Sequence, residues 1–149
     1  MSTFTKTLRS VAAIAAFGLA VPVMAGEGTI PVTIALDGVQ DTDAPLFVSV
    51  QKRDEYMGIK GHGEILKTTT DGTIMVTVNV DVADDYAVSV WHDLNDDGVF
   101  SMTDNYQILD GWGNSGPSDL TGRPSFDDVK VSVPFGGASA SVTMKYPAQ

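Results

Sequence analysis

Apolar and polar residues alternate along several short stretches of the chain from residue 29 onward. In residues 73–80 the side chains of Ile74, Val76, Val78 and Val80 share one face, opposite threonine, methionine and asparagine. A period of two places one face of a β-strand against a core and the other in water. The same alternation, or a short apolar run bounded by turn residues, predicts about seven strands, at residues 29–36, 45–51, 64–70, 73–80, 86–91, 127–134 and 138–146.

Turn residues between these stretches suggest how the strands connect. A polar turn follows residue 36 and predicts that the first two strands form a hairpin, and Asp71-Gly72 predicts another hairpin between the third and fourth. Pro31 cannot donate a backbone hydrogen bond, so we expect the first strand towards a sheet edge. No stretch keeps a helical period. The pattern predicts an all-β fold, a single antiparallel β-sandwich with prealbumin-like or Greek-key connections and long irregular loops at one end.

The segment 105–117 departs from this alternation. It is too rich in glycine for a helix and too irregular for a strand, and long ordered loops in compact domains are often functional. Tyr106 and Trp112 give the segment apolar area to bury. We expect Gly111, Gly113 and Gly116 to let the backbone fold tightly over the acidic residues that precede it, with Trp112 packed between them and the sandwich.

The first 25 residues read as a targeting segment and not as part of the fold. Lys6 and Arg9 precede an apolar run at residues 11–23, and Val23-Met24-Ala25 is a small-residue cleavage site. The apolar run is shorter than the roughly 20 residues that span a bilayer, so no membrane insertion is expected. The sequence therefore predicts a signal peptide at residues 1–25 and one domain at residues 26–149, exported to the periplasm or the extracellular space.

Charge and cysteine content narrow the functional classes. The chain carries 9 basic and 19 acidic residues and no cysteine. Removal of Lys6 and Arg9 takes the formal charge from −10 to −12, a surface that repels nucleic acid and attracts cations. The lack of cysteine excludes disulfides, thiol catalysis and thiolate metal sites. A nucleic-acid partner is therefore not expected.

Oxygen-bearing side chains concentrate after the strand that ends at Trp91. Counted from Asp93, they have the spacing of an EF-hand-type calcium loop, in which alternate residues of a tight turn point at one ion. Gly98 stands at the sixth position, where the chain must turn sharply. The predicted metal ligands are Asp93, Asn95, Asp97, the Val99 carbonyl and Asp104, with Ser101 at the ninth position.

Two features differ from a helix-loop-helix calcium hand. Asp104 is shorter than the glutamate usual at the twelfth position, and the residues before the loop form a strand. The alternative is an unmetallated polar turn, in which aspartate and asparagine side chains bind their own backbone. Both interpretations remain open at the level of the sequence, and Ca²⁺ is a possible cofactor.

No catalytic motif is recognisable, although His92 beside Asp93 is a conceivable acid–base pair. His62, between two glycines, is interpreted as a solvated loop residue. The favoured function is an exported noncatalytic envelope domain with a binding or structural role and an unknown protein or glycan partner. The alternative is a carbohydrate-binding or hydrolytic periplasmic protein in which Trp91, Tyr106 and Trp112 stack on a sugar. Possible ligand or loop contacts are His92, Tyr106, Trp112 and Asn114.

Three motifs follow one another in a recognisable order. His92-Asp93-Leu-Asn95-Asp-Asp97-Gly98 is followed by Gly111-Trp-Gly-Asn-Ser115 and then by Pro124-Ser-Phe-Asp-Asp128. This succession resembles domain of unknown function 2141, an uncharacterised family of exported bacterial proteins. The resemblance departs from the family pattern at Ser101, where an acidic residue is usual, and at residues 104–109. It implies the fold and export and assigns no activity.

We expect export with cleavage after Ala25, because the charged, apolar and small-residue regions stand in the order that signal peptidase requires. Intact-mass analysis of the exported protein should show Gly26 at its N-terminus. A mature pool that retains Met1 would contradict this prediction.

Overall fold

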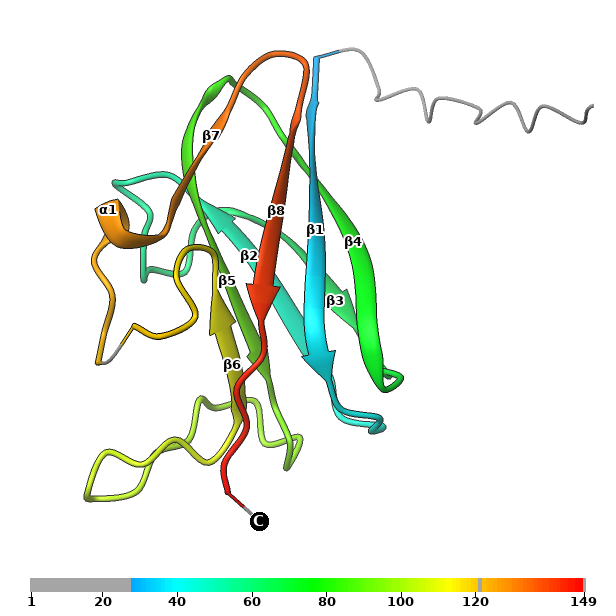
Figure 1. Cartoon of the computed structure of the whole chain (residues 1–149), viewed down its shortest axis with the longest axis vertical. Helices are drawn as coiled ribbons and strands as arrows, with labels where there is room; N and C mark the ends of the chain where they lie inside the picture. Colours follow the sequence, from blue (N-terminus) through cyan, green and yellow to red (C-terminus); the bar gives the residue numbers. More distant parts are fainter. Residues whose placement is uncertain (1–27, 121, 149) are drawn as a thin grey trace, which may run out of the picture.

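The computed structural model describes residues 28–120 and 122–148 and consists of two facing β-sheets that do not close into one (Figure 1). The first sheet has the order β4-β1-β8, from β1 (Ile30–Val39), β4 (Gly72–Val80) and β8 (Ala138–Thr143). The second has the order β3-β2-β5-β6, from β2 (Leu46–Gln51), β3 (His62–Leu66), β5 (Asp84–His92) and β6 (Gly111–Asn114), and β7 (Lys130–Val133) also pairs with β5. The one helix in the described residues is α1 (Phe126–Val129).

The core lies between the inner faces of the two sheets. In β1, Val32, Ile34 and Leu36 are fully buried, as their alternation predicts. They pack in one cluster with residues of both sheets, including Val50 and Tyr86. Burial of each such aliphatic side chain contributes about 1.5–3 kcal/mol. The all-β prediction is confirmed, and among the described residues no helix is long and apolar enough to cross a membrane.

The pairing of the strands differs from the prediction. β1 pairs with β4 antiparallel and with β8 in parallel, so it is the central strand of its sheet and the sheets are not purely antiparallel. Neither predicted hairpin forms, because the chain crosses from one sheet to the other between β1 and β2 and again between β3 and β4. Alternation identifies the buried face of a strand but not its partner. Pro31 is accommodated in the central strand because the ladder with β8 begins one residue later, at Val32.

Two elements, the strand β6 and the helix α1, were not expected from the sequence, and β6 brings the described strands to eight. β6 lies in the glycine-rich segment, where Gly111 and Gly113 face the interior. A Cβ at Gly111 would lie 2.5 Å from the Tyr146 ring, and one at Gly113 would lie 2.6 Å from Val142. These glycines therefore allow close approach to the C-terminal segment rather than folding over the acidic residues, a role typical of glycine within a strand.

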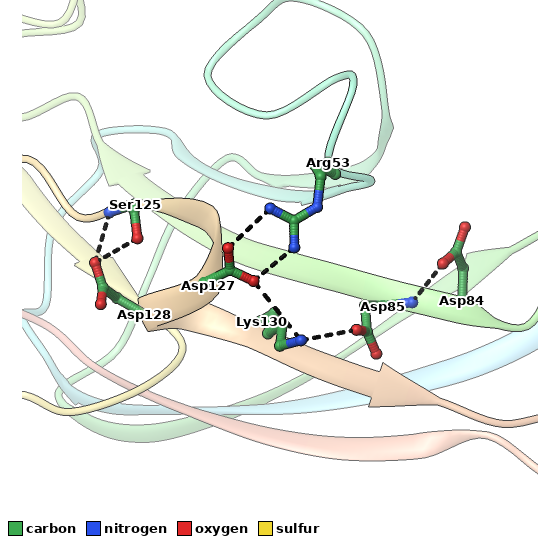
Figure 2. A network of polar contacts seen from close by, with 7 residues as sticks. All are labelled: Arg53, Asp84, Asp85, Ser125, Asp127, Asp128 and Lys130. Carbon is green, nitrogen blue, oxygen red and sulfur yellow. Dashed lines mark hydrogen bonds and ion pairs between the residues drawn. The ribbon is translucent and has the colours of Figure 1, made fainter.

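The helix α1 occupies the start of a predicted strand. Ser125 forms a capping box with Asp128: the backbone N–H of Ser125 donates to the Asp128 carboxylate at 2.8 Å and its hydroxyl donates at 2.6 Å (Figure 2). These hydrogen bonds lower the pKa of the Asp128 carboxyl. Phe126 and Val129 turn inward and pack on Ala87 of β5. Local capping thus overrides the alternation that predicts a strand from residue 127.

Long loops lie in two places and not at one end. The segment that joins β5 to β6 lies at the end where the chain also turns between β1 and β2 (Figure 1). The loop after β2 instead packs on α1, where the Tyr56 and Phe126 rings meet edge to face at 5.7 Å. Figure 2 shows Arg53 in this loop binding both carboxylate oxygens of Asp127, which also contacts Lys130. These exposed ion pairs contribute little to stability, because water and salt screen them.

Gly116 and Gly72 provide a matched test of the packing on α1. Both have φ near +100°, but a Cβ at Gly116 would lie 2.5 Å from the Asp128 carbonyl oxygen, whereas a Cβ at Gly72 would meet no atom within 4 Å. Both alanine variants carry backbone strain of about 1–2 kcal/mol. Gly116→Ala should lower the free energy of unfolding by about 2 kcal/mol more than Gly72→Ala in urea titrations. Equal losses would show that the contact with α1 adds nothing.

Candidate functional site

The site predicted from the sequence lies in the β5–β6 loop, residues 93–110, which begins and ends with a buried carboxylate. Asp93 is 0% exposed and Asp110 is 1% exposed. Because His92 pairs with Gly111 across β5 and β6, the two aspartates leave neighbouring strand ends. A buried carboxylate is costly unless hydrogen-bond donors surround it. Both carboxylates find those donors in the backbone of the loop.

Asp93 organises the first half of the β5–β6 loop. Its Oδ1 accepts a hydrogen bond from the Asp97 backbone N–H at 3.2 Å, and its Oδ2 accepts one from Gly98 at 2.8 Å. Its carbonyl accepts the Asp96 N–H at 3.2 Å. The loop turns tightly through Asp96 at φ 53° and Gly98 at φ 72°, both in the left-handed region. Gly98 thus supplies the sharp turn that the sequence predicts at this position.

Asp110 fixes the other side of the loop and was missed in the sequence analysis. Its Oδ1 accepts the Leu94 N–H at 3.2 Å, and its Oδ2 accepts both the Ser101 N–H at 2.9 Å and the Trp91 indole N–H at 3.1 Å. It therefore joins the start of the loop, its middle and the outer face of β5. In the sequence, only its position directly before Gly111 points to this role. That position becomes informative once β6 is known to pair with β5.

The remaining oxygens of the predicted metal set gather around Asp97. Asn95 Nδ2 donates to Asp97 Oδ2 at 2.7 Å, and the Ser101 hydroxyl lies 3.4 Å from the same oxygen and 3.1 Å from the Val99 carbonyl. The pKa of the Asp97 carboxyl is lowered mainly because its Oδ1 accepts a hydrogen bond from the Val99 N–H. The hydrogen bond from the Asn95 amide lowers this pKa further. Asp97 is exposed and stays ionised well into the acidic range.

Asp104 lies apart from this group. Residues 101–109 form a short hairpin, with a bridge between Met102 and Ile108 and a hydrogen bond of 2.8 Å from the Thr103 N–H to the Gln107 carbonyl. Asp104 stands in the turn of that hairpin and makes no hydrogen bond or ion pair with any residue in the described part of the chain. Within residues 28–120 and 122–148, no three histidine, aspartate or glutamate side chains are grouped to hold a metal ion.

His92 points into the interior and takes part in a buried polar network. Its Nδ1 lies 2.8 Å from the Tyr146 hydroxyl and its Nε2 lies 3.5 Å from the Thr69 hydroxyl. The Tyr146 hydroxyl also accepts the Gln40 N–H at 3.1 Å, and Thr69 donates to the Gln40 carbonyl at 2.6 Å. Burial lowers the pKa of His92. The imidazole therefore ties the C-terminal segment to two turns.

The aromatic residues singled out from the sequence are only partly together. Trp91 and Trp112 pair across β5 and β6, whereas Tyr106 is 84% exposed in the turn of the hairpin. Phe47 stacks on Trp91 at 4.7 Å, and Phe100 meets its ring edge to face at 6.3 Å.

Two further polar contacts complete this region of the second sheet. The Lys145 ammonium lies 4.6 Å from the centre of the Trp112 ring. Asn114 accepts a hydrogen bond from the Ser89 hydroxyl at 3.1 Å. One face of each tryptophan is thus in contact with another side chain of the protein.

A known family matches most of the chain. The model of a family described as an uncharacterized protein conserved in bacteria (DUF2141) matches residues 34–142. The chain belongs to this family, which confirms the resemblance seen in the sequence. No curated protein and no solved structure matches the chain.

The buried network predicts a pH dependence of stability. Because the folded state lowers the pKa of His92 below its ordinary 6.5, the unfolded chain binds the proton more readily. The contribution of His92 is complete above pH 6.5 and is lost as the pH falls towards the lower folded-state pKa. His92→Gln should reduce the slope of unfolding free energy against pH just below pH 6.5 in urea titrations. Equal slopes in the wild type and in His92→Gln would refute the assignment.

Proposed function

We propose that this chain is an exported, noncatalytic β-sandwich domain with a binding or structural role, and that its β5–β6 loop binds Ca²⁺. The observation that carries the proposal is the clustering of oxygens in one tight turn. Asp93 is directed into that turn, Asn95 contacts Asp97, and the Ser101 hydroxyl contacts both Asp97 and the Val99 carbonyl.

The donor set suits a hard cation. Carboxylate, amide, carbonyl and hydroxyl oxygens are the ligands that calcium takes, at roughly 2.3–2.6 Å, and nitrogen and sulfur ligands are not part of the turn. Each carboxylate oxygen of Asp93 accepts one hydrogen bond from the backbone, which leaves a further lone pair on each oxygen that can bind a metal ion. Asp97 supplies a second ionised carboxylate. The protein would hold the ion with Asp93, Asn95, Asp97 and Val99, completed by Ser101 or water in place of Asp104.

A binding role is supported by what the loop exposes. Several large apolar side chains of the loop are exposed, as are the acids Asp96, Asp97 and Asp104 of the same loop, and exposed apolar area is typical of interaction sites. Trp91 and Trp112 give less support to sugar stacking, because one face of each ring already contacts another side chain. The exposed apolar residues of the loop are Val99, Phe100, Met102, Tyr106 and Leu109.

A noncatalytic role agrees with the position of the only histidine near the loop. His92 is buried and directed away from the turn, towards Tyr146. General acid–base catalysis requires a group within hydrogen-bond reach of a substrate. The buried imidazole is placed to stabilise the fold.

Calcium should raise the melting temperature of the protein. With an affinity in the weak extracellular range, a Kd of about 10⁻⁴–10⁻³ M, calcium at about tenfold above Kd stabilises by about 1.4 kcal/mol. This corresponds to a shift of about 3–6 °C for a domain of this size. Asp97→Asn should abolish the shift because it removes an ionised ligand. Thermal unfolding in calcium and in excess chelator, at fixed ionic strength, measures the effect.

Asp119→Asn removes the same charge from an exposed position outside the loop and is the matched control. It should retain the full calcium shift, and Asp104→Asn should retain it too if the hairpin turn takes no part. A melting temperature that is the same in calcium and in chelator would contradict the proposal. A calcium shift that persists in Asp97→Asn would place the ion elsewhere.

A further inference from the structure

A small pocket lies beside β6 and includes no residue of the β5–β6 loop. One side is formed by β6 and by the C-terminal segment that follows β8 and runs next to it (Figure 1). The backbones of Trp112 and Lys145 join these two segments through hydrogen bonds of 2.9 and 2.7 Å. The other side is formed by the chain between β6 and α1, including Ser118 and Leu120. The pocket is therefore built from segments that main-chain pairing holds in place.

The charge of the pocket is opposite to that of the protein. The chain carries a formal charge of −10, yet Lys145 is the one charged residue that lines the pocket. Within residues 28–120 and 122–148, no carboxylate lies within ion-pair distance of its ammonium. The ammonium lies 4.6 Å from the centre of the Trp112 ring and 3.4 Å from the Leu120 carbonyl oxygen. An ammonium has three donors, so at least two remain for a ligand.

Neutral polar groups beside Lys145 also have unused hydrogen-bonding capacity. The amide oxygen of Asn114 accepts a hydrogen bond from Ser89, while its Nδ2 donates to no group in the part of the chain that the structure describes. The hydroxyls of Ser118 and Thr143 make no hydrogen bond there either. A carboxylate only accepts hydrogen bonds, and those from an ionised donor are the stronger ones. The pocket is thus matched to an anionic acceptor.

The size of the pocket restricts how an anion can enter. Its interior has room for about one water-sized group. One oxygen of a carboxylate fits that space, whereas a sugar ring does not, so the remainder of a ligand would stay at the open mouth. Ser118 and Thr143 are exposed and therefore lie towards that mouth. Their hydroxyls can meet hydroxyl groups on the ligand.

We propose that this pocket binds the carboxylate of a small hydroxylated acid, such as a sugar acid. The Lys145 ammonium and Asn114 Nδ2 hold the carboxylate, and the Trp112 ring keeps the lysine side chain in position. Ser118 and Thr143 bind hydroxyl groups of the ligand. The pocket is a second site, separate from the proposed calcium site, and the inference does not rest on calcium binding.

An NMR titration of isotope-labelled protein measures this binding at the pocket itself, through the signals of the Trp112 indole and the Asn114 side-chain amide. Glucuronate, at up to tens of millimolar in calcium-free buffer of fixed ionic strength, should shift both signals. Acetate offers the carboxylate alone and should bind more weakly. Glucose offers hydroxyls alone and should leave both signals unchanged.

Substitutions separate the pocket from the net charge of the protein. Lys145→Met removes the charge but keeps a flexible apolar side chain on Trp112, and it should weaken glucuronate binding by about tenfold or more. Lys67→Met removes the same charge from an exposed position outside the pocket and is the matched control, which should bind like the wild type. Thr143→Val removes one hydroxyl and should weaken the binding of glucuronate but not of acetate. Asp97→Asn should bind glucuronate like the wild type.

Pocket signals that respond to none of the three compounds would overturn the proposal. So would undiminished glucuronate binding in Lys145→Met, or an equal loss in Lys67→Met. Equal affinity of the wild type for acetate and glucuronate would contradict the assignment of a hydroxylated acid. If Lys145→Met does not fold, Thr143→Val and the three compounds with the wild type decide the question. None of these outcomes alters the expected effect of calcium on the melting temperature, so the two proposals fail separately.

Discussion

The arrangement of the site depends on the burial of two carboxylates at neighbouring strand ends. Asp93 and Asp110 are removed from water, and a buried carboxylate without donors would destabilise the fold. The donors they use are five N–H groups, of which four belong to the backbone of the β5–β6 loop. The requirement to satisfy the two carboxylates therefore fixes the path of a loop that has little regular structure of its own.

Three consecutive residues at and just after the end of β5 direct their side chains to three different parts of the molecule. Trp91 faces outward, packs on Phe47 and holds Asp110 through its indole N–H. His92 faces inward and binds Tyr146, which joins the C-terminal segment to the core. Asp93 leaves the strand and holds the turn. The strand thus supports both the core and the loop, and the loop can expose apolar and acidic side chains without loss of order.

The sequence predicted which residues are buried better than it predicted which strands pair. The alternation of β1 and β4 correctly indicated their inner faces, because burial on one face imposes a period of two. It could not show that β1 is central or that β8 runs parallel to it, since pairing depends on residues distant in sequence. β6 was missed because the glycines that let it approach Tyr146 and Val142 lower its strand propensity.

The candidate site was predictable to a similar degree. The spacing of Asp93, Asn95, Asp97 and Gly98 indicated a tight oxygen-rich turn, because the relative positions of residues close in sequence follow from the local backbone conformation. The position of Asp104 depended on a hairpin that spacing does not reveal. The role of Asp110 depended on the pairing of β5 with β6. The pairing of β5 with β6 therefore determines that Asp110, and not Asp104, lies beside the turn.

Amide hydrogen exchange of the loop tests the central claim, that two buried carboxylates hold the β5–β6 loop and with it the proposed cation site. We predict measurable protection at Leu94, Asp97, Gly98 and Ser101, whose N–H groups bind Asp93 or Asp110, and a further increase at Asp97 and Gly98 when calcium is added. Exchange at these four amides as fast as in an unstructured peptide, with and without calcium, would contradict the account.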